Sequence, residues 1–226
     1  MSMRKIILDT ETTGLDFKND RIIEIACLEL INDSYTGKKY HQYFNPGEIL
    51  ISEQAEQIHG LNNKFLEKYK TFDGSVNEFV EFIQNSPLII HNAQFDLSMI
   101  NNSFERINKP LIKRESAVCT LEMAKKKFPG SKNNLNALCR RFNIGLESRE
   151  KHGALTDCFL LLQVYTELIG GRQKRLDFAK EESKEFKEKK KVQKNNLLVL
   201  VSEEEKTLHS QMLADISNPI WKIYEN

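Results

Sequence analysis

The chain has 226 residues, of which 40% are hydrophobic and 29% are charged, and its formal net charge is +1. This length allows one well-formed core and an appendage, and the composition is that of an ordinary soluble protein. No apolar run approaches membrane-spanning length, and the first residues lead into a predicted strand rather than a signal sequence. A bulk charge near zero excludes general attraction to polyanions, so any nucleic-acid binding must come from local features.

Cysteine usage indicates a reducing compartment. The four cysteines are scattered along the chain, at Cys27, Cys119, Cys139 and Cys158. They lack the CxxC spacing that is typical of zinc sites and redox motifs. We therefore expect buried free thiols in a cytoplasmic protein, not a disulfide framework.

Apolar, β-branched runs predict an antiparallel meander at the start of the chain. Strands are expected from Ile6, at 21–30 and at 39–44, with turns at 32–33 and 36–37 closing a hairpin.

Helices and short buried strands alternate after the meander. Ser52 is a predicted N-cap for a helix that ends at 58–61. Apolar spacing and breakers then predict, in order, a helix at 76–83, a strand at 88–90, a helix at 97–107, a strand at 117–120, and helices at 121–127, 134–142 and 152–169. Three antiparallel strands followed by this alternation indicate an α/β sandwich with a mixed sheet flanked by helices.

The composition changes after the glycine pair at 170–171. Residues 171–195 are crowded with Lys and Glu and predict a flexible or solvated linker. Order is expected to return in 196–226, as a strand at 196–201, a helix N-capped by Ser202 and an apolar tail. This block is too small to bury its own apolar face, so we expect it to dock on another surface.

Two acids mark the end of the first strand. Asp9 and Glu11 are two residues apart, so the period of a strand points both side chains to the same side. Two neighbouring carboxylates repel each other unless a positive charge lies between them, and a divalent metal commonly supplies it. The alternative is a pair of solvated acids where the strand runs into a turn.

Three further residues are candidates for the same chemistry. Asp157 lies among apolar residues of a predicted helix, where a lone ionised acid is costly, whereas Asp96 opens an earlier helix. His152 precedes Asp157 by five residues, which on a regular helix separates them by about 140°. Taken singly, Asp96 could be a helix-start acid, His152 a surface histidine and Asp157 a satisfied helix acid. Their conjunction favours hard oxygen ligands together with a histidine base.

Three motifs make the chain recognisable. DTETTGL at 9–15, HNAQFD at 91–96 and HGALTD at 152–157 resemble, in order, the three motifs of the DEDDh superfamily of 3′→5′ exonucleases. Within it, the chain is similar to the epsilon (proofreading) subunits of bacterial DNA polymerase III, and the resemblance covers residues 4–170. It implies a ribonuclease H-like α/β fold.

The resemblance also implies an active site with two divalent cations, Mg²⁺ or Mn²⁺. Asp9 would bridge the two ions, Glu11 and Asp157 would complete the nucleophile-side ion, and Asp96 would support the second. His152 would act as the general base, because histidine changes charge near neutral pH.

Further positions follow from the same resemblance. The 3′-terminal nucleotide would be bound by Asp9, Glu11, Thr12, Leu15, Gln54, His59 and Phe95. At Gln54 the related enzymes carry a glutamate, and Gln does not supply the same charged acceptor for the terminal 3′-hydroxyl. Phe95 could instead be a core aromatic and His59 a helix-terminal histidine.

The region after the catalytic domain at 1–170 suggests partners. Gln173, Leu176 and Phe178 resemble the QxxLxF peptide by which polymerase subunits bind the sliding clamp, although the stretch could simply begin the linker. Residues 196–226 resemble the region that binds the polymerase alpha subunit, with Leu198 and Trp221 as anchors. The alternative is that this block packs back on the catalytic domain. A small theta-like subunit is a further possible partner.

The function expected from these features is removal of mismatched 3′-terminal nucleotides during DNA replication, at replication forks in the bacterial cytoplasm. One alternative is a stand-alone DEDDh exonuclease that processes RNA or single-stranded DNA 3′ ends, because metals that hold phosphate do not read the 2′-hydroxyl. A second is a non-catalytic scaffold that bridges polymerase and clamp.

Overall fold

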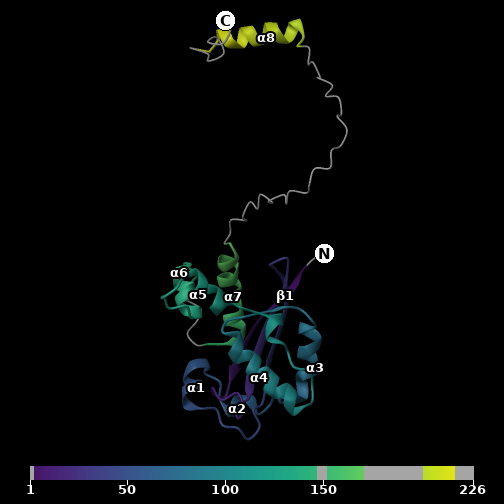
Figure 1. The fold of residues 1–226 in the computed structure, drawn as a ribbon, viewed down its shortest axis with the longest axis vertical. Coiled ribbons are helices and arrows are strands. Elements are labelled where there is room, and N and C mark those ends of the chain that lie inside the picture. The colour runs from purple at the N-terminus through teal and green to yellow at the C-terminus, as the bar shows by residue number, and fades with distance from the viewer. Residues whose placement is uncertain (1–2, 147–151, 171–200, 217–226) are drawn as a thin grey trace, which may run out of the picture. The chain divides into compact units, whose positions relative to one another are not determined.

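A computed structural model of the protein describes residues 3–146, 152–170 and 201–216. The chain divides into two compact units, Met1–Leu176 and Asp177–Asn226. The first holds a mixed sheet with helices on both faces (Figure 1), and each unit is described by itself.

The sheet has five strands in the order β3-β2-β1-β4-β5. They are β1 Arg4–Thr12, β2 Ile22–Ile31, β3 Ser34–Tyr43, β4 Leu88–Ile90 and β5 Ala117–Cys119. The first three are antiparallel, whereas β4 and β5 are parallel to β1. The predicted mixed α/β sandwich is therefore confirmed, and β1 lies at its centre.

The β2–β3 hairpin differs from the prediction at its turn. Asn32 and Asp33 alone form the turn, with φ of 51° and 63°, as the tight turn of a two-residue hairpin requires. The predicted second turn at 36–37 is wrong. Gly37 lies inside β3, at an irregularity where the pairing register with β2 shifts between Leu28 and Leu30. The third strand consequently begins five residues before the predicted start.

Helices follow the predicted order, with two short additions. They are α1 Glu53–His59, α2 Asn63–Leu66, α3 Phe72–Ile83, α4 Ala93–Arg106, the 3-10 turn η1 Arg114–Ser116, α5 Thr120–Lys127, α6 Leu135–Arg141 and α7 Ala154–Ile169. The Ser52 hydroxyl caps α1 by accepting from the Ala55 amide, as predicted. The sequence prediction did not include α2 or η1.

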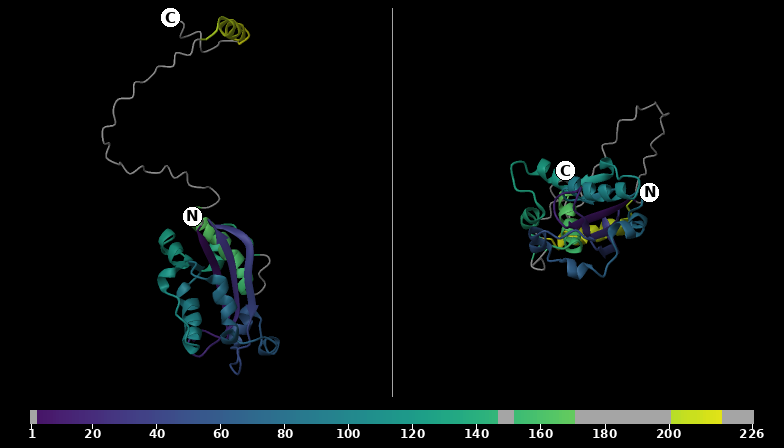
Figure 2. Two further views of the ribbon diagram at one scale, coloured as in Figure 1. Left: turned by 90° about the vertical axis from the view of Figure 1, so that its right-hand side faces the viewer. Right: turned by 90° about the horizontal axis from the view of Figure 1, so that it is seen from below.

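Alternation along β1 divides the core into two layers. Ile6 and Leu8 face the layer formed with α3 and α4, whereas Ile7 faces the layer formed with α5, α6 and α7. Figure 2 shows helices on both sides of the sheet. The same alternation continues to the end of the strand, so the acids at 9 and 11 face α7 and Thr10 faces α4.

The buried cysteines match their prediction: all four are free thiols in the core. Burial raises the pKa of Cys27 and Cys158 well above the usual range of a thiol.

The second unit contributes one described helix, α8 Glu203–Ala214. Ser202 and Glu205 form a capping box at its start, as the sequence pattern indicates. Leu208 and Met212 are exposed on it. The predicted strand at 196–201 lies outside the described residues except for Val201, and the apolar tail lies wholly outside them. Within the described ranges, no helix combines the length and apolar character needed to cross a membrane.

Candidate active site

The central strand and α7 meet at the predicted acids. Asp9 and Glu11 project from the end of β1 toward α7, and both are half-buried. Asp157 lies in the first turn of α7, on its buried side, with 5% of its surface exposed. Asp157 thus shares one end of the sheet with Asp9 and Glu11, although at least 146 residues separate it from them in the sequence.

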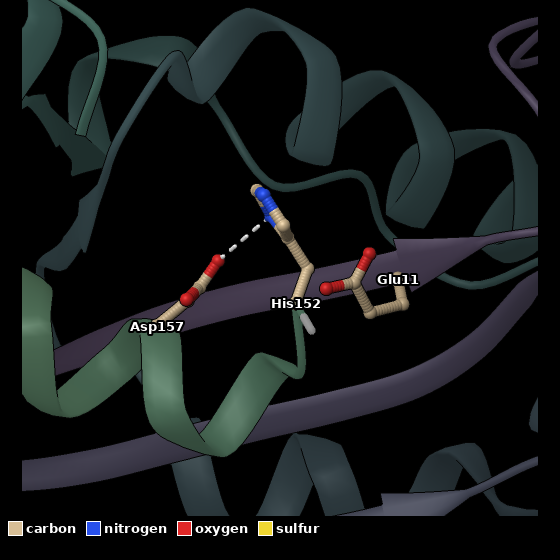
Figure 3. A group of neighbouring side chains, drawn as sticks. All are labelled: Glu11, His152 and Asp157. Atoms are coloured by element: carbon tan, nitrogen blue, oxygen red, sulfur yellow. Dashed lines mark ion pairs between the residues drawn. The ribbon is translucent and has the colours of Figure 1, made fainter. Parts of the chain in front are cut away.

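His152 lies against these acids although the helical spacing alone separates it from Asp157. It precedes α7, which begins after the N-cap Gly153, so helical geometry does not govern its side chain. Its Nδ1 is 3.3 Å from Oδ2 of Asp157, and Figure 3 shows the ring turned toward this carboxylate, with Glu11 nearby. The backbone amide of His152 donates to the Ile58 carbonyl at 3.0 Å, which ties this segment to the end of α1.

A possible metal-binding group lies here. Ligand atoms of Glu11, His152 and Asp157 all lie within 4.8 Å of one another. Two of these three are predicted metal ligands, and the third is the predicted base. The geometry therefore also permits His152 to act as a ligand, which is a different role from proton transfer.

Asp96 approaches from the opposite face of the sheet. It lies in the first turn of α4 with 4% of its surface exposed. The hydroxyl of Thr10 donates to Oδ1 of Asp96 at 2.7 Å, so the strand residue between the two acids orients the third. Sequence reasoning missed Thr10, although strand alternation places it on the α4 side.

Electrostatics at this end of the sheet are unfavourable without a cation. Burial raises the pKa of Asp9 well above its ordinary value, and the neighbouring charges of Asp96, Glu11, Asp157 and Glu24 raise it further. Burial raises the pKa of Asp96 to about 7, against the opposing effect of the Thr10 hydrogen bond.

These carboxylates are hard oxygen donors, the ligands that Mg²⁺ and Mn²⁺ prefer. Divalent cations would relieve the mutual repulsion that raises the pKa of Asp9. The residues present therefore fit bound divalent cations.

Glu24 is a further buried acid that sequence reasoning missed. It pairs with Glu11 across β1 and β2 and has 3% of its surface exposed. Its Oε1 lies 2.7 Å from Nε2 of His41 on β3. The sequence gives no motif around Glu24, which stands inside an apolar strand pattern. Its closeness to Glu11 and His41 follows only from the register of the strands.

A cavity of about 490 Å³ adjoins the acids. Its lining includes six of the seven predicted substrate residues, namely Glu11, Thr12, Leu15, Gln54, His59 and Phe95. Asp9 is not part of this lining. Ser52, Ala55 and Ile58 of the α1 region also line the cavity and were not predicted.

His59 occupies the last position of α1, which fits both of its sequence interpretations. It is buried, and its Nδ1 accepts from the Leu61 amide at 3.0 Å. Burial lowers its pKa, so the neutral imidazole is favoured. Phe95 also packs partly against the core, so its two interpretations are compatible as well.

The loop after β1 is held by Asp20. This carboxylate accepts from the Thr13 hydroxyl at 2.6 Å and from the Asp16 amide at 2.8 Å. A Cβ at Gly14 would lie 2.5 Å from the Asp20 carboxylate, so glycine permits the close approach. The loop presents Leu15 at the cavity with 81% of its surface exposed.

Comparison with known proteins decides the family. A family model described as Exonuclease matches residues 6–165. The DNA polymerase III subunit epsilon of Rickettsia felis is 46% identical over 176 residues, which cover 76% of each chain. That of Buchnera aphidicola subsp. Baizongia pistaciae is 39% identical over 236 residues, which cover 96% of each. The chain belongs to the exonuclease family, and within it to the DNA polymerase III epsilon subunits.

Solved structures show the same fold. Exonuclease X in complex with 5′ overhanging duplex DNA matches with a TM-score of 0.57 at 24% identity, over 73% of this chain and 90% of that one. The zinc-bound E. coli ExoI–ssDNA complex matches with a TM-score of 0.65 at 16% identity, over 76% of this chain and 41% of that one. The predicted exonuclease fold is thus confirmed.

The predicted partner-binding residues of this epsilon-family chain lie outside the described residues. They are Gln173, Leu176, Phe178, Leu198 and Trp221.

Proposed function

We propose that this protein is the 3′→5′ proofreading exonuclease of a bacterial DNA polymerase III, and that it removes mismatched 3′-terminal nucleotides during replication. The observation that carries the proposal is the convergence of Asp9, Glu11 and Asp157 with His152 beside a cavity of about 490 Å³. Membership of the epsilon family supports it. A non-catalytic scaffold would not need these acids and this histidine together.

The acids would hold two divalent cations, Mg²⁺ or Mn²⁺. Asp9, Glu11, Asp96 and Asp157 would be the residues that hold them. When bound, such ions stabilise the attacking and leaving oxygens of an in-line displacement at phosphorus. Thr10 contributes by fixing the Asp96 carboxylate through the hydrogen bond at 2.7 Å.

His152 would take the proton of the attacking water. The side chain is 41% exposed, so it reaches solvent, and Asp157 at 3.3 Å orients the ring. A water oxygen forms the new bond to the terminal phosphorus, the bond to the 3′-oxygen of the preceding nucleotide breaks, and this oxygen takes up a proton from solvent. The products are a 5′-mononucleotide and a strand with a new 3′-hydroxyl.

The cavity would receive the terminal nucleotide. Leu15 and Ile58 offer exposed apolar contacts for a base, and Gln54, which lines the same cavity, would contact the sugar. Preference for a mismatch needs no dedicated residue, because an unpaired 3′ end leaves the duplex at a lower cost than a paired one.

A primer-digestion assay tests this function. The full chain is incubated with matched and 3′-mismatched DNA primers and with RNA oligomers of the same sequence, with Mg²⁺ or EDTA, and with and without the polymerase. We expect EDTA-sensitive release of 5′-nucleotides from DNA, faster from the mismatched end. Equal or faster digestion of RNA would favour the stand-alone processing enzyme, and no hydrolysis in Mg²⁺ or Mn²⁺ would favour the scaffold.

The polymerase alpha subunit is the proposed partner of residues 196–226. Deletion of this segment is expected to leave hydrolysis of single strands unchanged and to end co-purification with the polymerase. Survival of the complex after the deletion would refute this assignment. Such a complex would place the protein in the cytoplasm at replication forks.

The sliding clamp is the proposed partner of residues 173–178. Joint substitution of Gln173, Leu176 and Phe178 by alanine is expected to abolish capture on immobilised clamp. Unchanged capture would refute it. A theta-like subunit would bind the catalytic domain, and co-expression with such a subunit tests that contact.

A further inference from the structure

The α5–α6 region concentrates positive charge in a chain whose net charge is only +1. Between Met123 and Leu146 the sequence contains six Lys and Arg residues and no Asp or Glu. We call these residues the basic surface: Lys125, Lys126, Lys127, Lys132, Arg140 and Arg141.

Two of the six cations have structural partners. The ammonium of Lys127 donates to the Glu167 carbonyl at the end of α7 at 3.1 Å. The guanidinium of Arg141 lies 4.3 Å from the centre of the Phe128 ring. Cations in the last turn of a helix also stabilise its dipole, which accounts for part of the basic character of both helices.

The other four cations are exposed and have no such partner. Lys125, Lys126, Lys132 and Arg140 form no ion pair with an acid of the described residues. The dipole interaction does not explain Lys132, because it lies on the loop between α5 and α6. The nearest described acid on this stretch, Glu122 in the first turn of α5, is paired with Arg114. Four exposed cations without an ion pair among the described residues favour binding of an anion.

A fixed loop presents the middle of this surface. The side-chain amide of Asn133 is buried and donates to the carbonyls of Phe128 and Ser131 at 3.1 and 3.0 Å. Its oxygen accepts from Arg141 at 3.3 Å. Lys132 therefore projects from a loop whose conformation is set by hydrogen bonds.

His91 links the loop that carries Lys132 to the region of the active site. This histidine lies at the end of β4, where its Nδ1 is 2.9 Å from the hydroxyl of Thr120, the first residue of α5. Burial lowers its pKa to about 4, against the opposing effects of a hydrogen bond to the Asn133 backbone and of the charge of Asp157. The loop that carries Lys132 thus contacts His91, and Asp157 is near enough to influence the charge of this histidine.

The surface extends along α7, beside which α5 and α6 lie in Figure 1. Asp157 is in the first turn of α7 and Lys127 contacts its last turn, at Glu167. Ten helical residues span about 15 Å, which corresponds to about four nucleotides of one strand at the duplex rise of about 3.4 Å each.

We propose that the basic surface binds the phosphodiester backbone of the DNA strand that leads to the 3′ end, a few nucleotides from the scissile bond. The proposal rests on the proposed exonuclease function. Cations at the acids would act only on the terminal phosphate, and a chain of net charge +1 has no bulk attraction for DNA, so binding of the rest of the strand requires local cations. Backbone contacts of this kind position a strand without reading its sequence, as a proofreading enzyme requires.

The test compares two variants of the full chain with equal charge. The first carries Lys126→Gln, Lys132→Gln and Arg140→Gln, one change from α5, one from the loop and one from α6. The control carries Lys39→Gln, Lys109→Gln and Lys113→Gln, on β3 and on the loop after α4. Affinity for a single-stranded 15-mer is measured in EDTA between 50 and 200 mM salt, and hydrolysis of a dinucleotide is measured in Mg²⁺.

We expect the control to match the wild type in both measurements. The basic-surface variant should hydrolyse the dinucleotide normally, because the proposal assigns the surface to nucleotides that a dinucleotide lacks. Its Kd for the 15-mer should be higher, and its salt dependence should be weaker by a slope of about 2, since each backbone contact to a single strand contributes about 0.7. Between 50 and 200 mM salt, the ratio of the variant Kd to the wild-type Kd should therefore change by about 20-fold.

Equal Kd and equal slope in the two triple variants would overturn the proposal. So would unchanged DNA binding combined with loss of co-purification with the polymerase, which would assign the surface to an acidic protein partner. Failure of the wild type to hydrolyse the dinucleotide would refute the proposed function instead, and the binding measurement in EDTA would still decide the role of the basic surface.

Discussion

The acid end of the sheet and the basic surface are charged in opposite ways and built differently. The acids come from β1, α4 and α7 and are buried or half-buried; burial raises the pKa of Asp9, and the other acids raise it further. The basic residues come from one continuous stretch and are exposed. Buried like charges are costly unless a cation joins them, whereas exposed charges cost little. The first region is therefore suited to chemistry, and the second to holding a polyanion.

Loss of an acid should have the largest effect. Asp9→Asn is expected to lower hydrolysis by more than about 10³-fold, since removal of one electrostatic stabiliser alone costs about 10²–10³. The melting temperature in EDTA should stay the same or rise, because a repelling charge is removed. Digestion of a labelled primer and a thermal melt measure the two effects. Retained activity in a folded variant would contradict the assignment of the acids.

His152→Ala should have the next largest effect and separates the two roles that the geometry allows. A general base contributes about 10²–10⁴ to rate, so turnover should fall by that factor while Mn²⁺ affinity stays unchanged. Turnover at saturating metal and a Mn²⁺ titration are measured on the same sample. A weakened Mn²⁺ affinity, with activity restored by excess metal, would make His152 a ligand alongside Glu11 and Asp157.

Thr10→Val should have an intermediate effect, because it acts only by orienting Asp96. Loss of the buried hydrogen bond of 2.7 Å is expected to lower activity by about 10–100-fold, as for other residues that orient metal ligands. Thr10→Ser keeps the hydroxyl and is the matched control. If the valine and serine variants have equal activity, the hydroxyl does not position Asp96 for catalysis.

Loss of the basic surface should have the smallest effect on turnover and a clear effect on affinity for the DNA strand. Its triple variant is expected to keep the wild-type turnover number on the 15-mer and to lose affinity. A reduced turnover number on the dinucleotide would show that the two regions do not have separate roles, because it would make the basic surface part of the catalytic machinery.

Much of the fold follows from local patterns in the sequence. Strand period alone places Asp9 and Glu11 on one face, and the Ser52 cap and the apolar spacing of α3 and α4 define their helices. The start of β3 was not predictable, because the left-handed turn at 32–33 and the irregularity at Gly37 depend on pairing with β2.

The candidate site likewise contains residues that the sequence predicts and residues that only the structure identifies. The motif residues were named from the sequence because a family resemblance joins three distant segments. Thr10 was not, since its bond to Asp96 connects positions 86 residues apart and leaves no local signal. The same holds for Glu24, whose partner His41 is known only from the register of β2 and β3.

Cation binding tests the account most directly. Mn²⁺ titration followed by electron paramagnetic resonance gives the number of ions bound to the wild type and to Asp9→Asn, without any substrate. The account predicts cooperative binding of two ions to the wild type and loss of at least one in the variant, because Asp9 would contact both. Equal stoichiometry and equal affinity in the two proteins would contradict it.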